Sequence, residues 1–473
     1  MNAILVGLIF YVLVMLVIGF ISYRYMGSLD DFLLGGRRLG PTVIAFSERA
    51  SGESAWFLLG LPGFAYAMGM SAYWTVIGCA IGIFISWVFI ATRLRKLTEE
   101  YNALTIPDYL EEKFRDRSRL IRLTSTLIIL VFYVVYLGAQ FIGAGKILNA
   151  TFGLEQNLGM LIGASIVVLY TMFGGFMAVA LTDLVQGAIM LAVAVIMPII
   201  GIMALGGPEQ LISKLHNIDP SLLTVTAGKH GRDLILGVIL GGLGVGLGYM
   251  GQPHLLTRYM AIDKVEHVRK GVLVAMLWVL FAYWGAALIG IVGLAYFGEG
   301  LKDAEAVMPN LATALFPPII AGFIIAGAVA AMMSTADSQL LVVTSAVVED
   351  IYRKLMGKDL SRKQSVRFSR WVTLVVSIIA FAIAIFAKNL IYWLVLYAWS
   401  GLGASFGPVI ILSLWWKKVN RWGALAGLIT GTLTTIVWYN IPVLKNTIYE
   451  LVPAFLFSTI AVVVVSLITQ KKE

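Results

Sequence analysis

The sequence is poor in cysteine, histidine and charged residues, and these shortages exclude several classes of protein. One cysteine, Cys79, cannot form a disulfide framework. The four histidines show no metal-ligand spacing with one another or with the cysteine. Only 13% of the residues are charged and 59% are hydrophobic, whereas soluble domains carry about 25% charged residues. We therefore expect lipid to be the solvent of a single transmembrane domain that comprises residues 1–473.

Thirteen apolar stretches are long enough to span a bilayer, which takes about 20 residues of helix. In lipid, every backbone group must pair within its own segment, which favours helices. The stretches are too long for barrel strands and do not alternate in polarity. The sequence thus predicts an all-α membrane protein of about 13 transmembrane helices. The predicted spans are 2–24, 42–67, 71–92, 120–145, 157–178, 183–205, 233–251, 270–296, 318–348, 368–387, 389–416, 422–440 and 447–469.

The distribution of basic residues predicts how these spans are oriented. Loops on one side, together with the C-terminal tail, carry 27 Lys and Arg, and the loops on the other side carry 7. The basic side of a membrane protein is cytoplasmic. We therefore predict a multi-pass protein of the cell (inner or plasma) membrane, with the N-terminus outside and the C-terminus inside, and a first span that is not a cleaved signal peptide. The net charge of +9 is then a topology signal, and nucleic acid is not an expected partner.

Span 2 contains three charged residues within the run SERASGESAW: Glu48, Arg49 and Glu53. Charges at this depth are costly unless they are paired or hydrated. The neighbouring small residues, such as Gly52, would let the helix unwind, and the backbone carbonyls freed by an unwound turn are suitable ligands for a hard cation. The alternative is a structural i,i+4 pair between Arg49 and Glu53.

Span 7 contains the run GGLGVGLGYMGQPH, in which five of the eight residues 241–248 are glycine. Glycine weakens a continuous helix, so we predict a break here, with close helix packing as the alternative role of these glycines. The run also contains G-x-G-x-x-G, but no strand precedes it, which argues against a dinucleotide site.

Span 9 carries the run AAMMSTADSQLL, which places Ala331, Ser334 and Thr335 on one helical face. Two hydroxyls and the alanine carbonyl could complete an oxygen cage for sodium, although such hydroxyls often bond back to the i−4 carbonyl instead. Asp337 needs a partner or a cation at that depth. Asp183 is a second coupling candidate, or alternatively a helix N-cap. No nucleophile–base pair or metal cluster lies within the spans, so an enzyme is not expected.

Several strings resemble the solute:sodium symporter family, and within it the bacterial sodium/proline symporters. They include LGGRRLGP, LLGLPGFAYAMGMSAYW, YTMFGGFMAVALTDLVQ, GYMGQPHLLTRYM and AAMMSTADSQLLVVTSAVVED. The resemblance implies a LeuT-type core of two inverted five-helix repeats, spans 2–6 and 7–11, in which spans 2 and 7 are discontinuous. It also implies cation-coupled import, with Na⁺ as the coupling ion, of a small organic solute such as proline or a related amino acid, by alternating access. The expected partners are this solute and the bilayer, and the expected state is a monomer or weak oligomer.

The resemblance also assigns site residues. Sodium would bind the carbonyls of Ala50, Glu53 and Ala331 and the hydroxyls of Ser334 and Thr335. The substrate-binding residues would be Ser54, Trp56, Tyr136, Val245 and Tyr249, and Arg49 is a candidate for contacting a substrate carboxylate.

Two departures from the family pattern leave alternatives open. The proline symporters carry an aspartate where this chain has Gly52, and the carboxylate of Glu53 lies one position later. A protonated Glu53 would make H⁺ the coupling ion. A pocket tryptophan is replaced by Val245, which leaves a roomier pocket. A transporter-derived membrane sensor is a further alternative, although we expect no signalling domain after Glu473.

Overall fold

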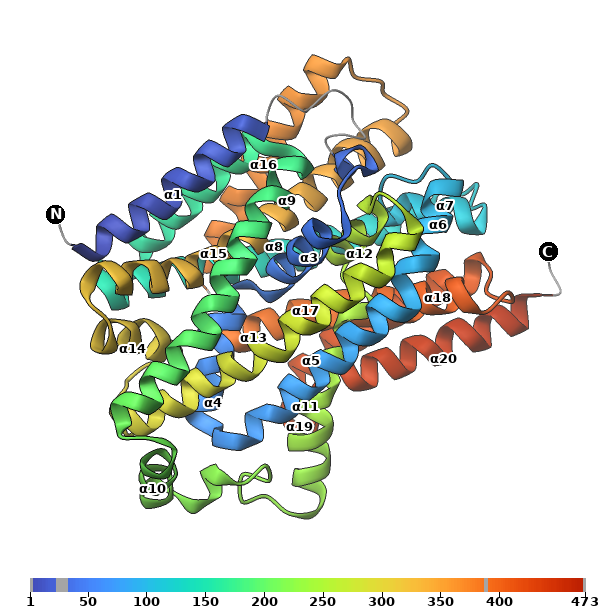
Figure 1. The fold of residues 1–473 in the computed structure, drawn as a ribbon. Coiled ribbons are helices and arrows are strands. Elements are labelled where there is room, and N and C mark those ends of the chain that lie inside the picture. The colour runs from blue at the N-terminus through green and yellow to red at the C-terminus, as the bar shows by residue number, and fades with distance from the viewer. Residues whose placement is uncertain (1–2, 23–32, 387–389, 471–473) are drawn as a thin grey trace.

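The protein is a bundle of long helices, many of which run obliquely across it (Figure 1). The computed structural model describes residues 3–22, 33–386 and 390–470. Every predicted span coincides with a helical segment over these residues. The predicted span ends at 2, 23–24, 387 and 389 lie outside the described residues. The main helices are α1 (Ala3–Ser22), α3 (Pro41–Ala55), α4 (Leu61–Met68), α5 (Tyr73–Ile85), α6 (Thr92–Glu100), α8 (Leu120–Phe152), α9 (Gln156–Leu205), α12 (Pro253–Ala261), α13 (Val268–Phe297), α15 (Pro318–Ser345), α16 (Arg362–Phe386), α17 (Ile391–Trp415), α18 (Arg421–Asn440) and α20 (Leu451–Thr469).

Length and hydropathy alone identify ten membrane-spanning helices within the described part of the chain. One of them, Pro41–Glu100, contains two predicted spans, which are separated at Gly69 by a turn with positive φ (58°). The predicted span 157–178 contains a shorter apolar helix, Gln156–Leu169, and the predicted span 422–440 is α18. The second span within Pro41–Glu100, the shorter helix Gln156–Leu169 and α18 account for the difference between the ten helices identified here and the thirteen predicted spans.

Three of the helical segments described by the structure are interrupted, two of them at a single residue. In α3, Ser54 adopts φ 58° and ψ −176°, after which the chain continues through a π-helical turn, η3 (Trp56–Gly60), into α4. In the span 7 region, the 3-10 turn η8 (Val245–Met250) ends at Gly251, and α12 begins at Pro253. In α9, Gly175 has nearly the same dihedral angles as Ser54, φ 58° and ψ −177°. The predicted breaks in spans 2 and 7 are therefore present.

The glycine run of span 7 also serves close packing. A Cβ on Gly246 would overlap the backbone of Gly78 in α5, so the two backbones could not approach so closely with larger residues. Both predicted roles of these glycines, breaking the helix and packing it, therefore hold in one segment.

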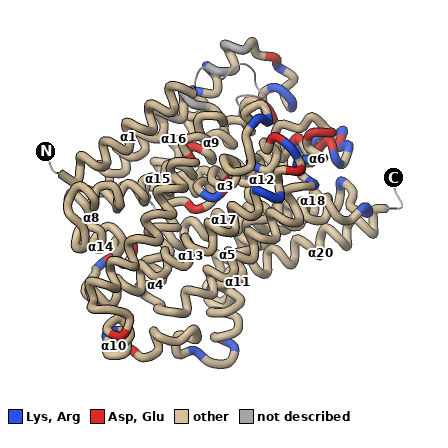
Figure 2. The backbone as a smooth tube through the Cα atoms, viewed as in Figure 1, with Lys and Arg blue, Asp and Glu red and all other residues tan. Residues whose placement is uncertain are grey.

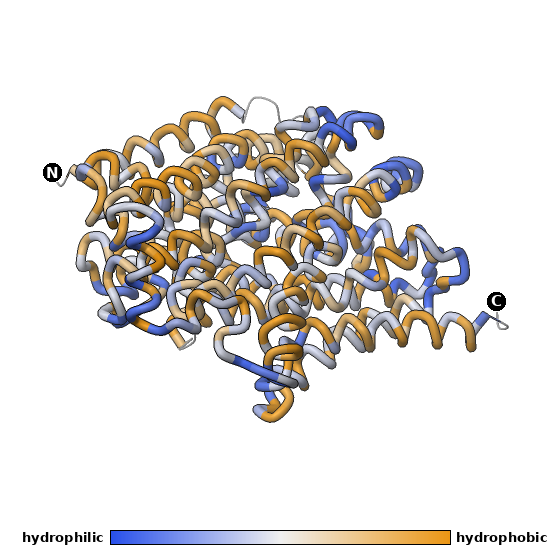
Figure 3. The backbone as a smooth tube through the Cα atoms, turned by 60° about the horizontal axis from the view of Figure 1, so that its bottom comes forward, coloured by the Kyte–Doolittle hydropathy of each residue, from blue (hydrophilic) through white to orange (hydrophobic). Residues whose placement is uncertain are grey.

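Charged and hydrophilic residues lie mainly toward the ends of the bundle, and apolar residues lie mainly in its middle. Charged positions gather around α6 and at the chain ends of neighbouring helices, whereas the middle of the bundle is mostly uncharged apart from a group around α3 (Figure 2). The hydrophilic segments likewise lie toward the ends, and the lengths of the helices between them are largely apolar (Figure 3). This is the pattern expected of a multi-pass membrane protein.

Candidate cation and substrate site

The break in α3 lies against the hydroxylated face of α15. The Ser334 hydroxyl donates to the Ala50 carbonyl at 2.9 Å and also lies 3.1 Å from the carbonyl oxygen of Ala331. The Thr335 hydroxyl donates to the Ser51 carbonyl at 2.8 Å. All of these residues are buried. Four predicted cation ligands, Ala50, Ala331, Ser334 and Thr335, thus meet at one junction.

The irregular backbone explains why these carbonyls are accessible. The amide of Ala55 donates to Gln140 of α8 at 2.9 Å instead of closing a helical turn onto Ser51. The Ser51 carbonyl is thereby available to Thr335 and to the His254 ring, at 3.2 Å. The predicted Glu53 carbonyl accepts from the Trp56 amide, and its membership of the cation site stays a prediction.

A second buried polar cluster adjoins this junction. Asp183 Oδ2 accepts from Ser47 at 2.6 Å and from Ser51 at 3.0 Å, and lies 3.3 Å from Arg258 Nη2. The same guanidinium donates to Ser51 at 2.8 Å and to Ser338 of α15. Asp183 lies inside α9, so the N-cap alternative is wrong. The cluster connects four helices, α3, α9, α12 and α15, around one buried ion pair.

The three charges of span 2 form a compact group of their own. Arg49 Nη1 donates to Glu53 Oε1 at 3.0 Å, and its Nε and Nη2 donate to the two oxygens of Glu48. Glu48 also accepts from Trp87 at 2.9 Å and from Tyr259 at 3.2 Å. The i,i+4 pair predicted as the structural alternative therefore exists, and the contact of Arg49 with a substrate carboxylate stays a prediction.

Five of the six predicted substrate-binding residues line one partly open cavity of about 230 Å³ beside the break. They are Ser54, Trp56, Tyr136, Val245 and Tyr249. The other lining residues include Val395, Leu396 and Trp399 of α17, which the sequence did not single out. Trp399 donates to the Val245 carbonyl at 2.9 Å, and its ring packs edge-on against Tyr249 with centroids 4.7 Å apart. The walls are mainly aromatic and aliphatic, as small-molecule sites usually are.

Aromatic side chains close this cavity toward one end of the bundle. Trp56 stacks on Tyr392 with ring centroids 5.9 Å apart, and Tyr392 stacks on Phe64 at 4.5 Å. Beyond them lies an open cavity of about 1650 Å³, which shares Val245 and Leu396 with the smaller one. Its rim includes Lys229, in the predicted outer loop 206–232.

The coupling candidate Asp337 is buried in α15 next to this site. Its Oδ1 accepts from Ser338 at 3.0 Å, and Ser338 in turn bonds Ser51. Asp337 is therefore linked to the Asp183–Arg258 cluster through one hydroxyl, and its role in coupling stays a prediction.

A broken-helix bundle with a buried cavity and an oxygen-rich junction defines a secondary transporter. Residues 32–431 match the sodium:solute symporter family, and the chain belongs to that family. It is 42% identical over 460 residues to the high-affinity proline transporter PutP of Bacillus subtilis, covering 96% of each chain. It is 40% identical to the sodium/proline symporter of Escherichia coli, covering 97% of this chain and 91% of the relative.

Solved structures share the fold. A Na⁺-coupled sialic acid symporter in a substrate-bound outward-open state superposes with a TM-score of 0.81 at 21% identity, covering 98% of both chains. MhsT in complex with L-phenylalanine superposes with a TM-score of 0.57 at 14% identity, covering 91% of this chain and 98% of that one. The predicted LeuT-type core and family are confirmed, and the chain is a transporter and not an enzyme.

Proposed function

We propose that this protein imports L-proline, or a close relative of it, together with Na⁺. The observation that carries the proposal is the meeting of α3 carbonyls with α15 hydroxyls beside a cavity lined by aromatic residues. The relatives that are named as proline transporters support the choice of solute.

Sodium would bind at the α3–α15 junction. It is a hard cation that prefers oxygen ligands, and Ala50, Ala331, Ser334 and Thr335 supply carbonyl and hydroxyl oxygens there. The Glu53 carbonyl would complete the set. A cation held between the broken helix and α15 binds the two conformations of the bundle differently, which is what coupling requires.

The solute would bind in the cavity of Trp56, Tyr136, Val245 and Tyr249. The flat rings suit the apolar ring of proline, and the helix that restarts at Trp56 presents its N-terminal end to the same region. Such half-helix ends favour anionic substrate groups such as a carboxylate. Val245 leaves more room than an indole would, so slightly larger cyclic amino acids also fit the proposal.

The end of the bundle with α6 would face the cytoplasm, because the basic loops gather there. The wide cavity lined by Lys229 would then open outward, and the structure would represent an outward-facing state. The N-terminus would lie outside and the C-terminus inside. Release inward would require the α6 end to open while the Trp56–Tyr392–Phe64 stack stays closed.

Uptake of labelled L-proline by proteoliposomes tests this function. We expect accumulation with an inward Na⁺ gradient, none with choline in place of Na⁺, and no effect of a protonophore. The proton-coupled alternative has one supporting observation, the buried Glu53 carboxyl beside the cavity. It predicts the opposite pattern: accumulation without Na⁺ that a protonophore collapses and that Glu53→Gln abolishes.

A further inference from the structure

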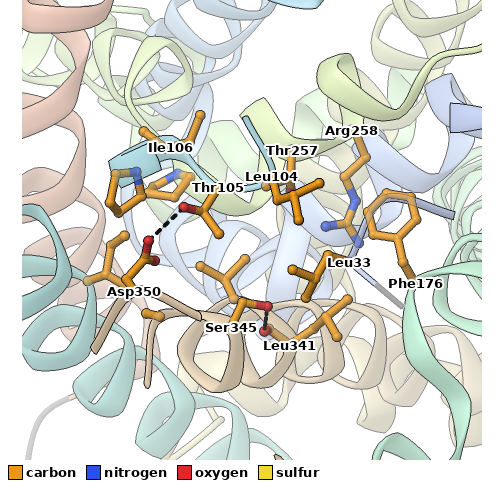
Figure 4. A pocket seen from close by; sticks show the side chains of 15 residues that line it. Leu33, Leu104, Thr105, Ile106, Phe176, Thr257, Arg258, Leu341, Ser345 and Asp350 are labelled. Atoms are coloured by element: carbon orange, nitrogen blue, oxygen red, sulfur yellow. Dashed lines mark hydrogen bonds between the residues drawn. The ribbon is translucent and has the colours of Figure 1, made fainter. Parts of the chain in front are cut away.

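A separate cavity lies near the α6 end of the bundle, beyond the Asp183–Arg258 cluster (Figure 4). It is a partly open cavity of about 410 Å³, and its walls come mainly from α7 (Ile106–Phe114), α12, α15 and the π-helical turn η11 (Ala346–Leu355). Arg258 lies on one side, and Asp350 lies on the other beside Thr105. Most of the wall between them is apolar, so the few oxygen atoms determine what the cavity can bind.

The carboxyl of Asp350 is the distinctive group of this cavity. It is fully buried, and its Oδ1 accepts from Thr105 at 3.0 Å and from Arg122 at 2.6 Å. Its Oδ2 has no hydrogen-bond partner within the ranges that the structure describes. A buried carboxylate oxygen without a partner is costly, and a bound cation would satisfy it.

The π-helical turn brings Asp350 into register with the hydroxylated face of α15. In an α-helix, five residues advance the side chain well past one turn, whereas a π-helical turn is closed by an i→i+5 bond. Ser345 and Asp350, five residues apart, consequently line the same cavity. Ser334 and Ser338 lie further along α15. Oxygen-bearing side chains therefore recur from the candidate cation junction to Asp350.

The charges around Asp350 leave a negative surplus. Arg122 contacts three carboxylates, those of Asp108 at 2.7 Å, Glu111 at 2.6 Å and Asp350 at 2.6 Å. Lys354 adds one positive charge 3.9 Å from Asp108. Three carboxylates thus face two cations, and the adjacent Glu349 is neutralised by Arg353 at 2.5 Å. Arg258 on the far wall is paired with Asp183. A monovalent cation at Asp350 would balance the group.

We propose that Asp350, with the hydroxyls of Thr105 and Ser345, forms a second binding site for the coupling cation, where Na⁺ pauses between the α3–α15 junction and the cytoplasm. The inference rests on the proposed function, which makes Na⁺ the coupling ion and the α6 end cytoplasmic. It assigns a role to a carboxylate 15 residues beyond Thr335, in a turn that does not touch the substrate cavity.

Measuring the Na⁺ requirement separately at each face of oriented proteoliposomes tests this site. External Na⁺ is varied during L-proline uptake, and internal Na⁺ is varied during L-proline efflux. For Asp350→Asn, we expect the half-saturating internal concentration to rise by about tenfold or more and the external value to change by less than about twofold. Ser345→Ala, which removes only a hydroxyl, should shift the internal value in the same direction by a smaller factor and covers the case in which Asp350→Asn fails to fold.

Asp108→Asn is the matched control, because it removes one carboxylate from the same Arg122 but does not line the cavity. Because it also lowers the negative charge around Arg122, it should raise the half-saturating internal Na⁺ concentration by a smaller factor than Asp350→Asn does. An equal shift for Asp108→Asn and Asp350→Asn, or an unshifted internal value in Asp350→Asn and Ser345→Ala, would overturn the site. If the unaltered protein required Na⁺ at neither face, the proposed function itself would fail.

Discussion

The Ser334 hydroxyl of α15 donates a 2.9 Å hydrogen bond to the Ala50 carbonyl of α3. Ala50 lies four residues before Ser54, where the backbone leaves the helical conformation. The uninterrupted helix α15 is thereby joined to the interrupted helix α3, at the point where backbone carbonyls of α3 no longer accept regular helical hydrogen bonds. The substrate cavity begins at the same break. The affinity for an ion at this contact would therefore depend on the positions of both helices. This proximity is the structural basis of the coupling proposed above.

The charged group of span 2 should be essential for stability. Arg49→Met leaves Glu48 and Glu53 buried without their shared counter-ion, and breaking a buried pair in this way costs about 3–5 kcal/mol. We expect a large drop in the melting temperature of the purified protein. The exposed Arg232→Met is a control for the loss of one arginine and should melt as the unaltered protein does. An unchanged melting temperature for Arg49→Met would show that Glu48 and Glu53 do not need Arg49 as their counter-ion in the folded protein.

Val245 should control the size of the accepted solute. An indole at this position would fill part of the cavity between Trp56 and Trp399, so Val245→Trp should favour proline over its six-membered homologue pipecolate by roughly tenfold. Competition against labelled L-proline measures this ratio, and Val245→Ile serves as a control of similar shape. An unchanged ratio would place the solute elsewhere.

Glu450 should give the protein a pH-dependent stability. It lies just before α20, lines the wide outer cavity, and burial raises its pKa to about 7. The folded state therefore holds this proton more tightly than the unfolded state does, so the stabilisation is complete below the unfolded pKa of 4.5 and is lost as the pH rises through about 7.

Glu450→Gln mimics the protonated side chain and should remove this contribution. The fall in melting temperature between pH 5 and 7 should be smaller in Glu450→Gln than in the unaltered protein. Asp219→Asn, in an exposed turn, is the comparison variant. Parallel pH profiles for Glu450→Gln and the unaltered protein would contradict the prediction.

Local sequence features predicted the helices and their interruptions well. Apolar length identified the spans, and the small and charged residues around Ser54 and the glycines before Gly251 marked the breaks, because both signals are contained in a few consecutive residues. The boundary between the fifth and sixth predicted spans was less accurate. Hydropathy suggested 179–182, but the chain turns at Gly175, where a positive φ is available without steric cost.

Contacts between distant segments could not be predicted in the same way. Arg258 follows the predicted end of span 7, yet the chain continues beyond the break as α12, and the guanidinium reaches Asp183, 75 residues earlier. Trp399 and Gln140 lie in ordinary apolar spans, and only the packing of α17 and α8 around the break brings them to the site. The sequence pattern of one segment does not indicate which distant segments pack against it.

Sodium movement driven by solute tests the central claim most directly. An inward L-proline gradient should drive ²²Na⁺ into proteoliposomes that contain the unaltered protein. Replacing both hydroxyls, Ser334→Ala with Thr335→Ala, should abolish this Na⁺ entry. Thr344→Ala lies on the same helix α15, but its hydroxyl pairs with Thr373 of α16, so this control variant should retain Na⁺ entry. Undiminished ²²Na⁺ entry in the double variant would contradict the assignment of the cation to the junction of α3 and α15.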